Sequence, residues 1–158
     1  MTEKDYDFCV RNFADGVYRF LLKHCKNSSL AKDIVQDTFM KLWERKEYVN
    51  PLKMKSYIYT TAYHKLVDET RRNITVVNKN EISLQTKSTY SDVKDVLDKA
   101  LHRLPEIQKT IILLRDYEGY SYNEIGEILE LSEQQVKVYI FRARVTLKTY
   151  IKNIDNII

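Results

Sequence analysis

The 158-residue chain contains only three Gly and two Pro, the residues that tight turns use most. Gly supplies the positive φ angles of many turns and Pro fixes the φ angle of others, so a sheet with many tight turns needs more of both. We therefore exclude turn-rich β folds. The length suits one domain or two small ones, and two helical units of about 70 residues would each bury a modest core.

Nothing in the sequence places the chain outside the cytoplasm. Cys9 and Cys25 are too far apart for a metal-binding knuckle and no other Cys accompanies them, so we interpret them as half-buried thiols of a reducing compartment. The first residues, Met-Thr-Glu-Lys-Asp-Tyr-Asp, are polar and acidic, unlike a signal peptide. The longest aliphatic run, Ile111–Leu114, is far shorter than the roughly 20 residues of a membrane span. We expect a cytoplasmic protein with no membrane insertion.

Motifs of catalysis are missing as well. The sequence holds no glycine-rich phosphate loop, no Cys/His cluster at metal-ligand spacing and no nucleophile paired with a base. Its three His, at positions 24, 64 and 102, are scattered among ordinary helical patterns. We therefore predict that the protein is not an enzyme and that it holds no metal and no cofactor.

Charge, in contrast, is plentiful and unevenly placed. Charged residues make up 30% of the chain, yet the net charge is only +4. Residues 133–152 carry five Lys and Arg against one acidic residue, and residues 53–72 carry five against two. Two separate basic segments are what a polyanionic partner such as a nucleic acid requires.

Two helix starts stand close together in the second half of the chain. Ser121 and Ser132 lie eleven residues apart and can each cap a helix. Glu124 and Gln135, three residues further on, are expected to close a capping box at each start. A pair of well-capped helices at this spacing is typical of a helix-turn-helix or of an ordinary helical hairpin.

Only residues 129–131 remain for the turn between these helices, so the two must cross steeply. Gly126 has no side chain, which lets the second helix approach the first closely. The second helix of a helix-turn-helix enters the DNA major groove, and the basic charge of this one favours DNA binding over a plain hairpin. We predict that the second helix contacts DNA through Glu133, Gln134, Gln135, Lys137, Val138, Arg142 and Arg144.

The first half predicts three helices. Residues 5–25 have apolar side chains at helical spacing, and Gly16 leaves one bent helix or two short ones open. Ser28 or Ser29 is expected to cap a second helix, which runs to about residue 46. Asn50-Pro51 then begins a third helix that runs to about residue 72. The apolar stripe of the second helix comprises Leu30, Ile34, Val35, Phe39, Leu42 and Trp43.

The other face of this second helix is polar. A charged face is usually only solvated, but it can also be the surface that meets a partner, and the pattern by itself leaves both open. The residues on this face are Asp33, Gln36, Asp37, Met40 and Glu44.

The third helix interleaves aromatic and basic residues. Its core-facing positions, at steps of four, are Met54, Ile58, Ala62 and Leu66. Rings can stack on unpaired bases while cations hold phosphates, which suits single-stranded nucleic acid, although tyrosines of this kind also serve in a core or at its rim. The candidate nucleic-acid residues are Tyr57, Tyr59, Tyr63, His64, Lys65, Arg71 and Arg72.

Residues 74–91 break the helical pattern and are rich in Asn, Ser, Thr and Lys, so we interpret them as a flexible linker. Helical order then returns with an apolar stripe at Val93, Val96, Leu97, Ala100, Leu101 and Leu104. Pro105 opens a further helix that Gly119 ends, before the helix-turn-helix. The predicted fold is therefore all-α, with two small helical domains, residues 1–73 and 92–158, joined by the linker.

Four longer motifs occur in a fixed order along the chain. They are Asp33-Ile-Val-Gln-Asp-Thr-Phe-Met-Lys-Leu-Trp43, Ala62-Tyr-His-Lys-Leu-Val-Asp68, Leu104-Pro-Glu106 and Glu118-Gly-Tyr-Ser-Tyr-Asn-Glu-Ile125. Through them both halves resemble one family, the bacterial RNA polymerase sigma factors, specifically the extracytoplasmic-function (ECF) group of the sigma-70 family. The resemblance covers about residues 8–72 and 93–152, and the order and spacing of the motifs make it highly specific.

The resemblance implies a dissociable initiation factor that directs core RNA polymerase to promoters and helps open them. Residues 1–73 would form the region 2 domain: the polar face of the second helix would bind a coiled coil on the large polymerase subunit, and the third helix would melt the minus-ten element. The loop at residues 46–53 would capture a flipped-out base. Residues 92–158 would form the region 4 domain, whose recognition helix reads the minus-thirty-five element. The implied partners are the beta-prime and beta subunits, promoter DNA and an anti-sigma factor.

Some positions depart from the family pattern. Tyr63-His64 stands where Arg-Asn is common, and Glu130 replaces the usual Gly of the turn, which would be strained in a left-handed conformation. The alternative function is a stand-alone helix-turn-helix repressor or activator that binds duplex DNA as a dimer. That alternative leaves the first half unexplained, and no heptad seam indicates a dimer.

Overall fold

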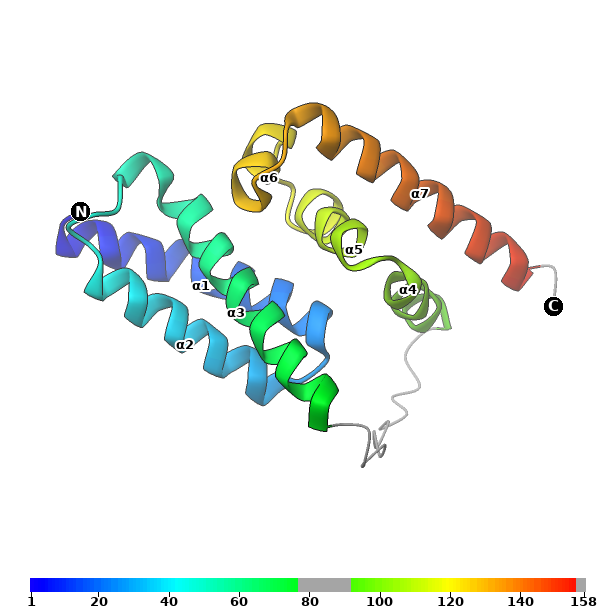
Figure 1. Ribbon diagram of the computed structural model, residues 1–158, viewed down its shortest axis with the longest axis horizontal. Coiled ribbons are helices and arrows are strands. Elements are labelled where there is room, and N and C mark those ends of the chain that lie inside the picture. Colours follow the sequence, from blue (N-terminus) through cyan, green and yellow to red (C-terminus); the bar gives the residue numbers. More distant parts are fainter. Residues whose placement is uncertain (77–91, 156–158) are drawn as a thin grey trace.

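The computed structural model describes residues 1–76 and 92–155, and every regular element in these two ranges is helical (Figure 1). The first half comprises α1 (Glu3–Cys25), α2 (Ser28–Glu44), the short 3-10 turn η1 (Pro51–Lys53) and α3 (Met54–Val76). The second half comprises α4 (Asp92–Arg103), α5 (Glu106–Ile112), the π-helical turn η3 (Leu113–Tyr117), α6 (Tyr122–Leu129) and α7 (Glu133–Asp155). The predicted all-α fold class is confirmed.

Helices α1, α2 and α3 pack against one another as a three-helix bundle (Figure 1). Each helix contributes one apolar stripe to a common core, as its periodicity predicts. Burying one large aliphatic or aromatic side chain contributes about 1.5–3 kcal/mol, so this shared core is what chiefly holds the bundle together. Its buried side chains include Val17, Phe20, Leu21, Ile34, Leu42, Ile58, Ala62 and Leu66.

The first helix, α1, is continuous over 23 residues, so the alternative of two short helices is excluded. Gly16 lies buried in its middle. A Cβ atom at this position would lie only 2.7 Å from the hydroxyl oxygen of Tyr59 on α3. Gly16 is therefore a point of close approach between α1 and α3 rather than a break in α1.

The start of α2 lies one residue away from its predicted cap. Asn27, rather than Ser28 or Ser29, is the N-cap, and its Oδ1 accepts a hydrogen bond from the backbone N–H of Leu30 at 3.1 Å. Lys26 ends α1 in a left-handed conformation with a φ of 53°, so the chain reverses at once. Asn27 is the extended residue that directly precedes α2, which makes it the cap.

The start of α3 is as predicted, whereas its end lies later. Asn50 Oδ1 accepts from the backbone N–H of Leu52 at 3.0 Å, with Pro51 as the first residue of η1. The α3 helix continues to Val76, so residues 74–76, which we expected in the linker, are helical. The rest of the predicted linker, residues 77–91, lies outside the described residues.

In the second half, α7 packs on α4, α5 and α6. Gly119 adopts a φ of 75° and ends the helical run after η3, as the sequence predicts. The π-helical turn itself has no counterpart in the sequence pattern. Of the predicted α4 stripe, Ala100, Leu101 and Leu104 are buried, and the side chain of Val93 lies outside the described residues.

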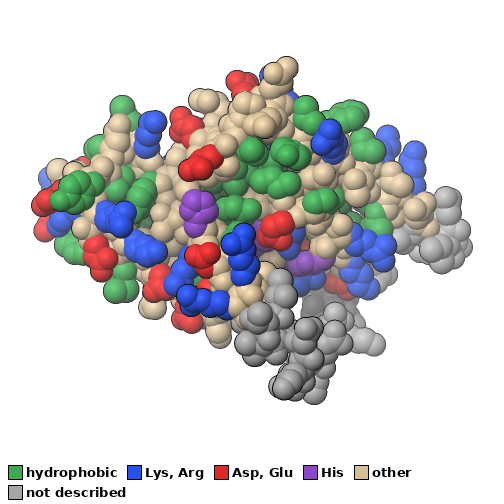
Figure 2. Space-filling model, viewed as in Figure 1, with side chains coloured by type: hydrophobic (Ala, Val, Ile, Leu, Met, Phe, Trp, Pro, Cys, Tyr) green, Lys and Arg blue, Asp and Glu red, His purple; other side chains and the backbone are tan. Residues whose placement is uncertain are grey.

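The two halves pack against each other. Helix α3 contacts α6, and α1 contacts η3 (Figure 1). One continuous core cluster includes Phe20 and Tyr59 from the first half and Tyr120 and Ile125 from the second. On the face shown in Figure 2, Lys and Arg side chains lie among Asp and Glu over the left and centre, whereas the right-hand side shows mainly Lys and Arg. The sequence predicts two domains; the structure adds that they meet.

Candidate nucleic-acid interfaces

Both helices of the helix-turn-helix begin at a predicted serine cap, but only one capping box is complete. Ser132 N–H donates to Gln135 Oε1 at 2.9 Å, and Gln135 N–H donates to Ser132 Oγ at 3.1 Å. Ser121 Oγ accepts from Glu124 N–H at 3.1 Å, yet the Glu124 carboxylate lies 2.6 Å from the Lys55 ammonium of α3. The reciprocal half of the Ser121 box is therefore a wrong prediction, because a cation from the other half of the chain takes the carboxylate.

The turn between α6 and α7 is as tight as predicted. A Cβ atom on Gly126 would lie 2.6 Å from the backbone oxygen of Leu131, which only a glycine avoids. Glu130 adopts the left-handed conformation, with φ 58° and ψ 44°. A non-glycine residue in this conformation is strained, so the departure from the family pattern at Glu130 carries an energetic cost.

Helix α7 presents its predicted DNA-contacting side chains to solvent. Buried Val136, Ile140 and Ala143 fix its inner face against the rest of the second half. The outer side of its first two turns therefore faces solvent. The exposed candidates are Glu133, Gln134, Gln135, Lys137, Val138, Arg142 and Arg144.

Two cations of α7 have partners within the chain. The Arg144 guanidinium lies 2.7 Å from Asp116 Oδ1, and this hydrogen bond raises the pKa of Arg144. The Lys137 ammonium lies 3.7 Å from Glu133 Oε1, which is an exposed pair of little energetic weight. Arg144 is thus held toward η3, whereas the side chain of Lys137 can exchange its partner for a phosphate.

The three tyrosines of α3 differ in how deeply they are buried. Tyr59 is completely buried between Phe20 and Tyr120, whose ring centroids lie 5.7 and 5.0 Å from its own. This burial raises the pKa of Tyr59 above its ordinary value. Tyr57 and Tyr63 are only partly buried. Tyr59 therefore cannot stack on a base while the halves are packed in this way, which corrects the prediction for this residue.

The charged candidates on α3 lie near the surface. The Lys65 ammonium lies 3.7 Å from Asp37 of α2 and 3.8 Å from Glu69. Ion pairs of this kind contribute at most about 1 kcal/mol, so a phosphate can replace the carboxylates. Lys65 also joins the polar face of α2 to the predicted nucleic-acid face of α3. The exposed or partly exposed candidates here are His64, Lys65, Arg71 and Arg72.

The loop before α3 exposes two large apolar side chains that the sequence patterns did not indicate. Tyr48 is 88% and Leu52 is 93% exposed. Apolar side chains this exposed are typical of binding surfaces. Apart from these two, Val49 and Pro51, the loop at residues 45–53 is charged or polar, and large apolar side chains in such a loop are the signal that could have identified them.

The polar face of α2 is open to solvent, as its predicted role requires. Trp43, predicted for the core, is 41% exposed and packs edge-on against Tyr6 of α1 with ring centroids 4.9 Å apart. The prediction was wrong because Trp43 lies at the margin of the bundle. One turn from Met40, which is 60% exposed, it adds apolar area to this face. The predicted residues of the face are exposed or partly exposed: Asp33, Gln36, Asp37, Met40 and Glu44.

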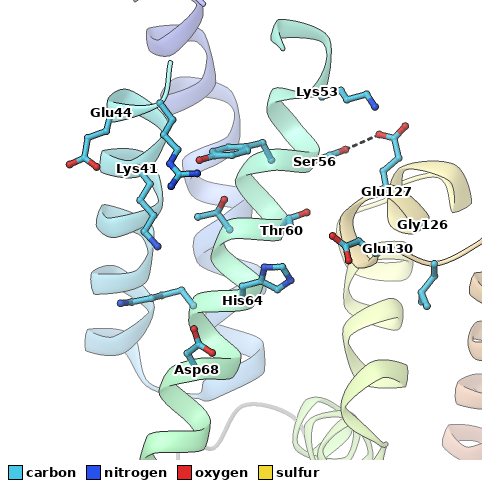
Figure 3. A pocket seen from close by; sticks show the side chains of 15 residues that line it. Lys41, Glu44, Lys53, Ser56, Thr60, His64, Asp68, Gly126, Glu127 and Glu130 are labelled. Atoms are coloured by element: carbon cyan, nitrogen blue, oxygen red, sulfur yellow. Dashed lines mark hydrogen bonds between the residues drawn. The ribbon is translucent and has the colours of Figure 1, made fainter. Parts of the chain in front are cut away.

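A pocket of about 870 Å³ lies where α2 and α3 meet the turn between α6 and α7 (Figure 3). His64 of α3 and Glu130 of the turn both line it, and Ser56 Oγ donates across the junction to Glu127 Oε2 at 3.0 Å. Ser56 and Glu127 are 71 positions apart, so no local pattern could have found this pocket. Its lining carries both signs of charge, from Lys41, Arg45, Lys53 and Lys65 and from Glu44, Asp68, Glu127 and Glu130.

Both halves of the chain are similar in sequence to known proteins. The family model described as Sigma-70 region 2 matches residues 9–74, and the one described as Sigma-70, region 4 matches residues 94–147. Over 139 residues the chain is 33% identical to the RNA polymerase sigma factor SigV of Bacillus subtilis (strain 168), an alignment that covers 85% of this chain and 84% of SigV. Over 150 residues it is 27% identical to the ECF RNA polymerase sigma factor SigM of the same strain, covering 90% and 92%. The chain belongs to the ECF sigma factors of the sigma-70 family.

This membership decides between the two functions that the sequence left open. A sigma factor is a dissociable initiation factor that directs RNA polymerase to promoters, and this predicted function is confirmed. The alternative of a stand-alone repressor or activator is not favoured, because it offers no role for the region 2 match over residues 9–74.

Solved structures share the fold of this sigma factor. Its coordinates match the sigma factor RpoE of Bartonella quintana, solved in complex with the anti-sigma factor NepR, with a TM-score of 0.74 at 24% identity over 94% of this chain and 98% of that one. They match CnrH, solved in complex with the cytosolic domain of CnrY, with a TM-score of 0.73 at 18% identity over 96% and 90%. Within residues 1–76 and 92–155 of the sigma factor, no helix is long and apolar enough to cross a membrane.

Proposed function

We propose that this sigma factor divides promoter recognition between its halves. Residues 1–73 act as the region 2 domain, which binds core polymerase and opens the minus-ten element. Residues 92–158 act as the region 4 domain, which reads the minus-thirty-five element. The observation that carries the proposal is α7, where buried Val136, Ile140 and Ala143 anchor a helix whose opening turns are polar and exposed.

The first turns of α7 would recognise base pairs in duplex DNA. Gln134 is exposed there, and a glutamine can pair bidentately with adenine for about 1–3 kcal/mol of discrimination against a wrong base. Arg142 and Arg144 lie later along the helix, where side chains hold phosphates and fix the register of the protein on the duplex.

The promoter DNA strands would be opened by α3 and the loop before it. Partly buried Tyr57 and Tyr63 can stack on unpaired bases once their surroundings open, and such stacking contributes about 1–3 kcal/mol per base. Tyr48, which is 88% exposed, would meet a flipped-out base before α3. His64 beside Tyr63 gives this surface a different hydrogen-bonding edge from the Arg-Asn pair common in the family. The phosphates of the strand would be held by Lys65, Arg71 and Arg72.

Core polymerase would bind the polar face of α2 through the coiled coil of its beta-prime subunit, and the region 4 domain would meet the beta subunit. The carboxylates of Asp33 and Asp37 suit a basic partner, while Met40 and Trp43 supply apolar area beside them. The sigma factor would work in the cytoplasm and would have no catalytic activity of its own.

An anti-sigma factor is the further partner that we propose. RpoE and CnrH, which share this fold, are both solved in complex with a second protein. On the outer side of α7, Val138, Phe141 and Val145 are 43%, 69% and 48% exposed at helical spacing, which gives an amphipathic partner an apolar surface to cover.

Association with polymerase tests the function as a whole. The purified chain should co-elute with core RNA polymerase on gel filtration and should direct transcription from specific sites on genomic DNA. A chain that binds promoter duplex by itself, ignores core polymerase and supports no transcription would restore the repressor or activator alternative.

A further inference from the structure

Two positions at which this sigma factor departs from the family pattern line the same pocket. His64 stands where an Asn is common, and Glu130 replaces the usual Gly of the turn between α6 and α7. They are 66 positions apart, yet both line the pocket of about 870 Å³, and in Figure 3 the His64 ring points from α3 toward the turn. Because other members of the family work with Asn and Gly at these positions, the pair indicates a property of this chain beyond the shared function.

Glu130 is retained at the cost of backbone strain. It lies in the left-handed region, with φ 58° and ψ 44°, which a residue with a Cβ disfavours. Within residues 1–76 and 92–155 its exposed carboxylate forms no hydrogen bond or ion pair, and the exposed His64 ring forms no hydrogen bond. Strained non-glycine residues occur chiefly at functional sites such as ligand clamps. Both side chains therefore have hydrogen-bonding groups free for a ligand in the pocket.

The elements that line the pocket differ in charge. Helices α2 and α3, with η1 between them, contribute four cations and two carboxylates, whereas α6 and the turn contribute two carboxylates and, among the described lining residues, no cation. Residues 1–76 and 92–155 contain no group of three or more His, Cys, Asp and Glu that could hold a metal ion, so these carboxylates act as hydrogen-bond acceptors. A ligand with an anionic end and a hydrogen-bond donor end matches this division. The cations are Lys41, Arg45, Lys53 and Lys65, and the carboxylates beside the turn are Glu127 and Glu130.

A guanine nucleotide has both of these ends. Its base presents N1–H and the 2-amino group side by side, and one carboxylate can accept from both. On the other edge of the base, O6 and N7 accept hydrogen bonds, which an imidazole N–H can donate. Adenine carries an acceptor, N1, beside its amino group, and a carboxylate repels that acceptor. The phosphate is the anionic end, and the volume lies within the range of about 300–1,000 Å³ that is usual for ligand pockets.

We propose that this pocket binds a free guanine mononucleotide. Glu130 accepts from N1–H and the 2-amino group, and His64 donates to O6 or N7. Lys41 and Arg45, one turn apart on α2 and without an ion pair among the described residues, hold the phosphate.

The site overlaps the surface that the proposed function assigns to strand opening. Tyr57, His64 and Lys65 line the pocket and also belong to that surface. A bound nucleotide should therefore compete with a single DNA strand for the same side chains of α3. This consequence, unlike the site itself, rests on the proposed function.

The first experiment measures base preference by isothermal titration calorimetry on the full chain. GMP should bind one to one in the micromolar range. IMP lacks only the 2-amino group and should bind about tenfold more weakly, because one hydrogen bond to a charged acceptor is lost. AMP, guanosine and inorganic phosphate should each bind more weakly than GMP.

The second experiment assigns the contacts to side chains. Glu130→Ala removes the carboxylate but keeps the Cβ, so the preference for GMP over IMP should fall from about tenfold to about one. Glu3→Ala removes an exposed glutamate of α1 outside the pocket and should keep the full preference. Lys41→Gln should weaken GMP and IMP alike and leave the binding of guanosine unchanged. Amide chemical shifts in ¹⁵N spectra of the wild-type chain should change on GMP addition at Thr61, Gly126 and Leu131, which line the pocket.

The third experiment tests competition. Fluorescence anisotropy follows the binding of a labelled oligothymidine, which contains no guanine. GMP at ten times its own dissociation constant should weaken this binding about tenfold. If GMP shows the expected base preference but leaves the oligonucleotide bound, or if the oligonucleotide does not bind, the nucleotide site stands and the strand-opening role of α3 is wrong.

Four results overturn the nucleotide site. They are no binding of GMP at millimolar concentration, equal binding of GMP, IMP and AMP, inorganic phosphate binding as tightly as GMP, and a preference for GMP that Glu130→Ala leaves unchanged. An oligothymidine with one guanine separates the two sources of the base. If that strand binds more tightly than plain oligothymidine while GMP does not bind, the pocket recognises a base of the promoter strand and the free nucleotide is excluded.

Discussion

At the scale of single residues, the two glutamines in the first turn of α7 have different roles. Gln135 Oε1 accepts the backbone N–H of Ser132 and completes the cap of the helix. Gln134, in the same turn, is exposed. Substituting Gln135 would therefore mix a loss of stability with a loss of base reading, and Gln134 is the sharper probe of readout.

We expect Gln134→Ala to change which promoters are used. Loss of a bidentate contact removes about 1–3 kcal/mol of discrimination at one base pair, so the ratio of activities between promoters that differ there should shift. Arg142→Ala should instead weaken all promoters together, because its exposed guanidinium would contact phosphate, and Arg144→Ala should do the same with the added loss of its ion pair to Asp116. In vitro transcription from a set of promoters with single changes in the minus-thirty-five element measures both. An equal loss at every promoter for Gln134→Ala would contradict the readout assignment.

Protonation of His24 should make the stability of the junction between the halves depend on pH. Burial, followed by the Lys109 ammonium and His102, lowers the pKa of His24 to about 3. The Glu106 carboxylate, 3.2 Å from Nδ1, favours the charged imidazole but is 57% exposed, so solvent weakens its effect. The imidazole is therefore neutral in the packed state, where its Nε2 lies 2.7 Å from Thr110 Oγ1, a hydroxyl that donates to the backbone oxygen of Glu106.

Stability should therefore fall in mild acid. A group whose folded-state pKa lies below its ordinary value of 6.5 contributes stability above that pH and loses it as the pH falls toward 3. At pH 5 the loss for His24 alone is about 2 kcal/mol. We expect a lower Tm at pH 5 than at pH 7.5, and a smaller difference in His24→Gln, which hydrogen-bonds but does not titrate. His102, whose pKa is lowered to about 4 chiefly by burial, should account for part of what remains. A pH dependence unchanged in His24→Gln would exclude this role.

At the scale of elements, the turn between α6 and α7 combines a required glycine with a strained glutamate. Gly126 leaves room for the backbone oxygen of Leu131, whereas Glu130 holds a φ of 58° that its Cβ disfavours. The carboxylate of Glu130 is exposed at this turn, so its side chain does not compensate the strain by burial.

We expect Glu130→Gly to stabilise the second half by about 1 kcal/mol, since a left-handed residue with a Cβ costs about 1–2 kcal/mol and Gly loses some of that gain to chain entropy. Glu130→Ala removes the same carboxylate but keeps the Cβ, and serves as the matched control. Thermal denaturation of the three chains should place only the glycine variant above the wild type. A gain shared by both variants would assign the effect to charge instead of backbone strain.

At the scale of the whole molecule, the proposed polymerase face of α2 reaches the pocket between the halves at Glu44, whereas Asp33 does not line that pocket. Asp33 is exposed on the polar face of α2, and its neighbour Asp37 pairs with Lys65 at 3.7 Å. Charge reversal at Asp33 therefore tests polymerase binding with the smallest disturbance of α3.

We expect Asp33→Lys to melt within about 0.5 kcal/mol of the wild type, as exposed substitutions usually do. A like charge facing a basic partner costs several kcal/mol, so binding to core polymerase and promoter-directed transcription should both be lost. Asp37→Lys, alone or with Asp33→Lys, should act in the same direction with an added effect on α3. A double variant that folds normally and supports full transcription would show that this face is only solvated.

The sequence by itself determined the helices, their order and the family. Periodic apolar positions, the serine caps of α6 and α7, and Gly126 act within about five residues of one another, so these signals do not depend on how the two halves dock. This is why α7, the tight turn and the polar face of α2 could all be predicted before the fold was known.

Only the tertiary structure determined which side chains of α3 are buried and which distant residues they contact. In the sequence, Tyr59 and Tyr63 belong to the same aromatic and basic segment. Tyr59 is nevertheless buried, because Tyr120, 61 positions away, lies against it. Glu124 likewise lost its predicted capping role to Lys55, 69 positions away. Contacts between distant segments depend on how the two halves dock, and periodicity within one helix holds no information about that.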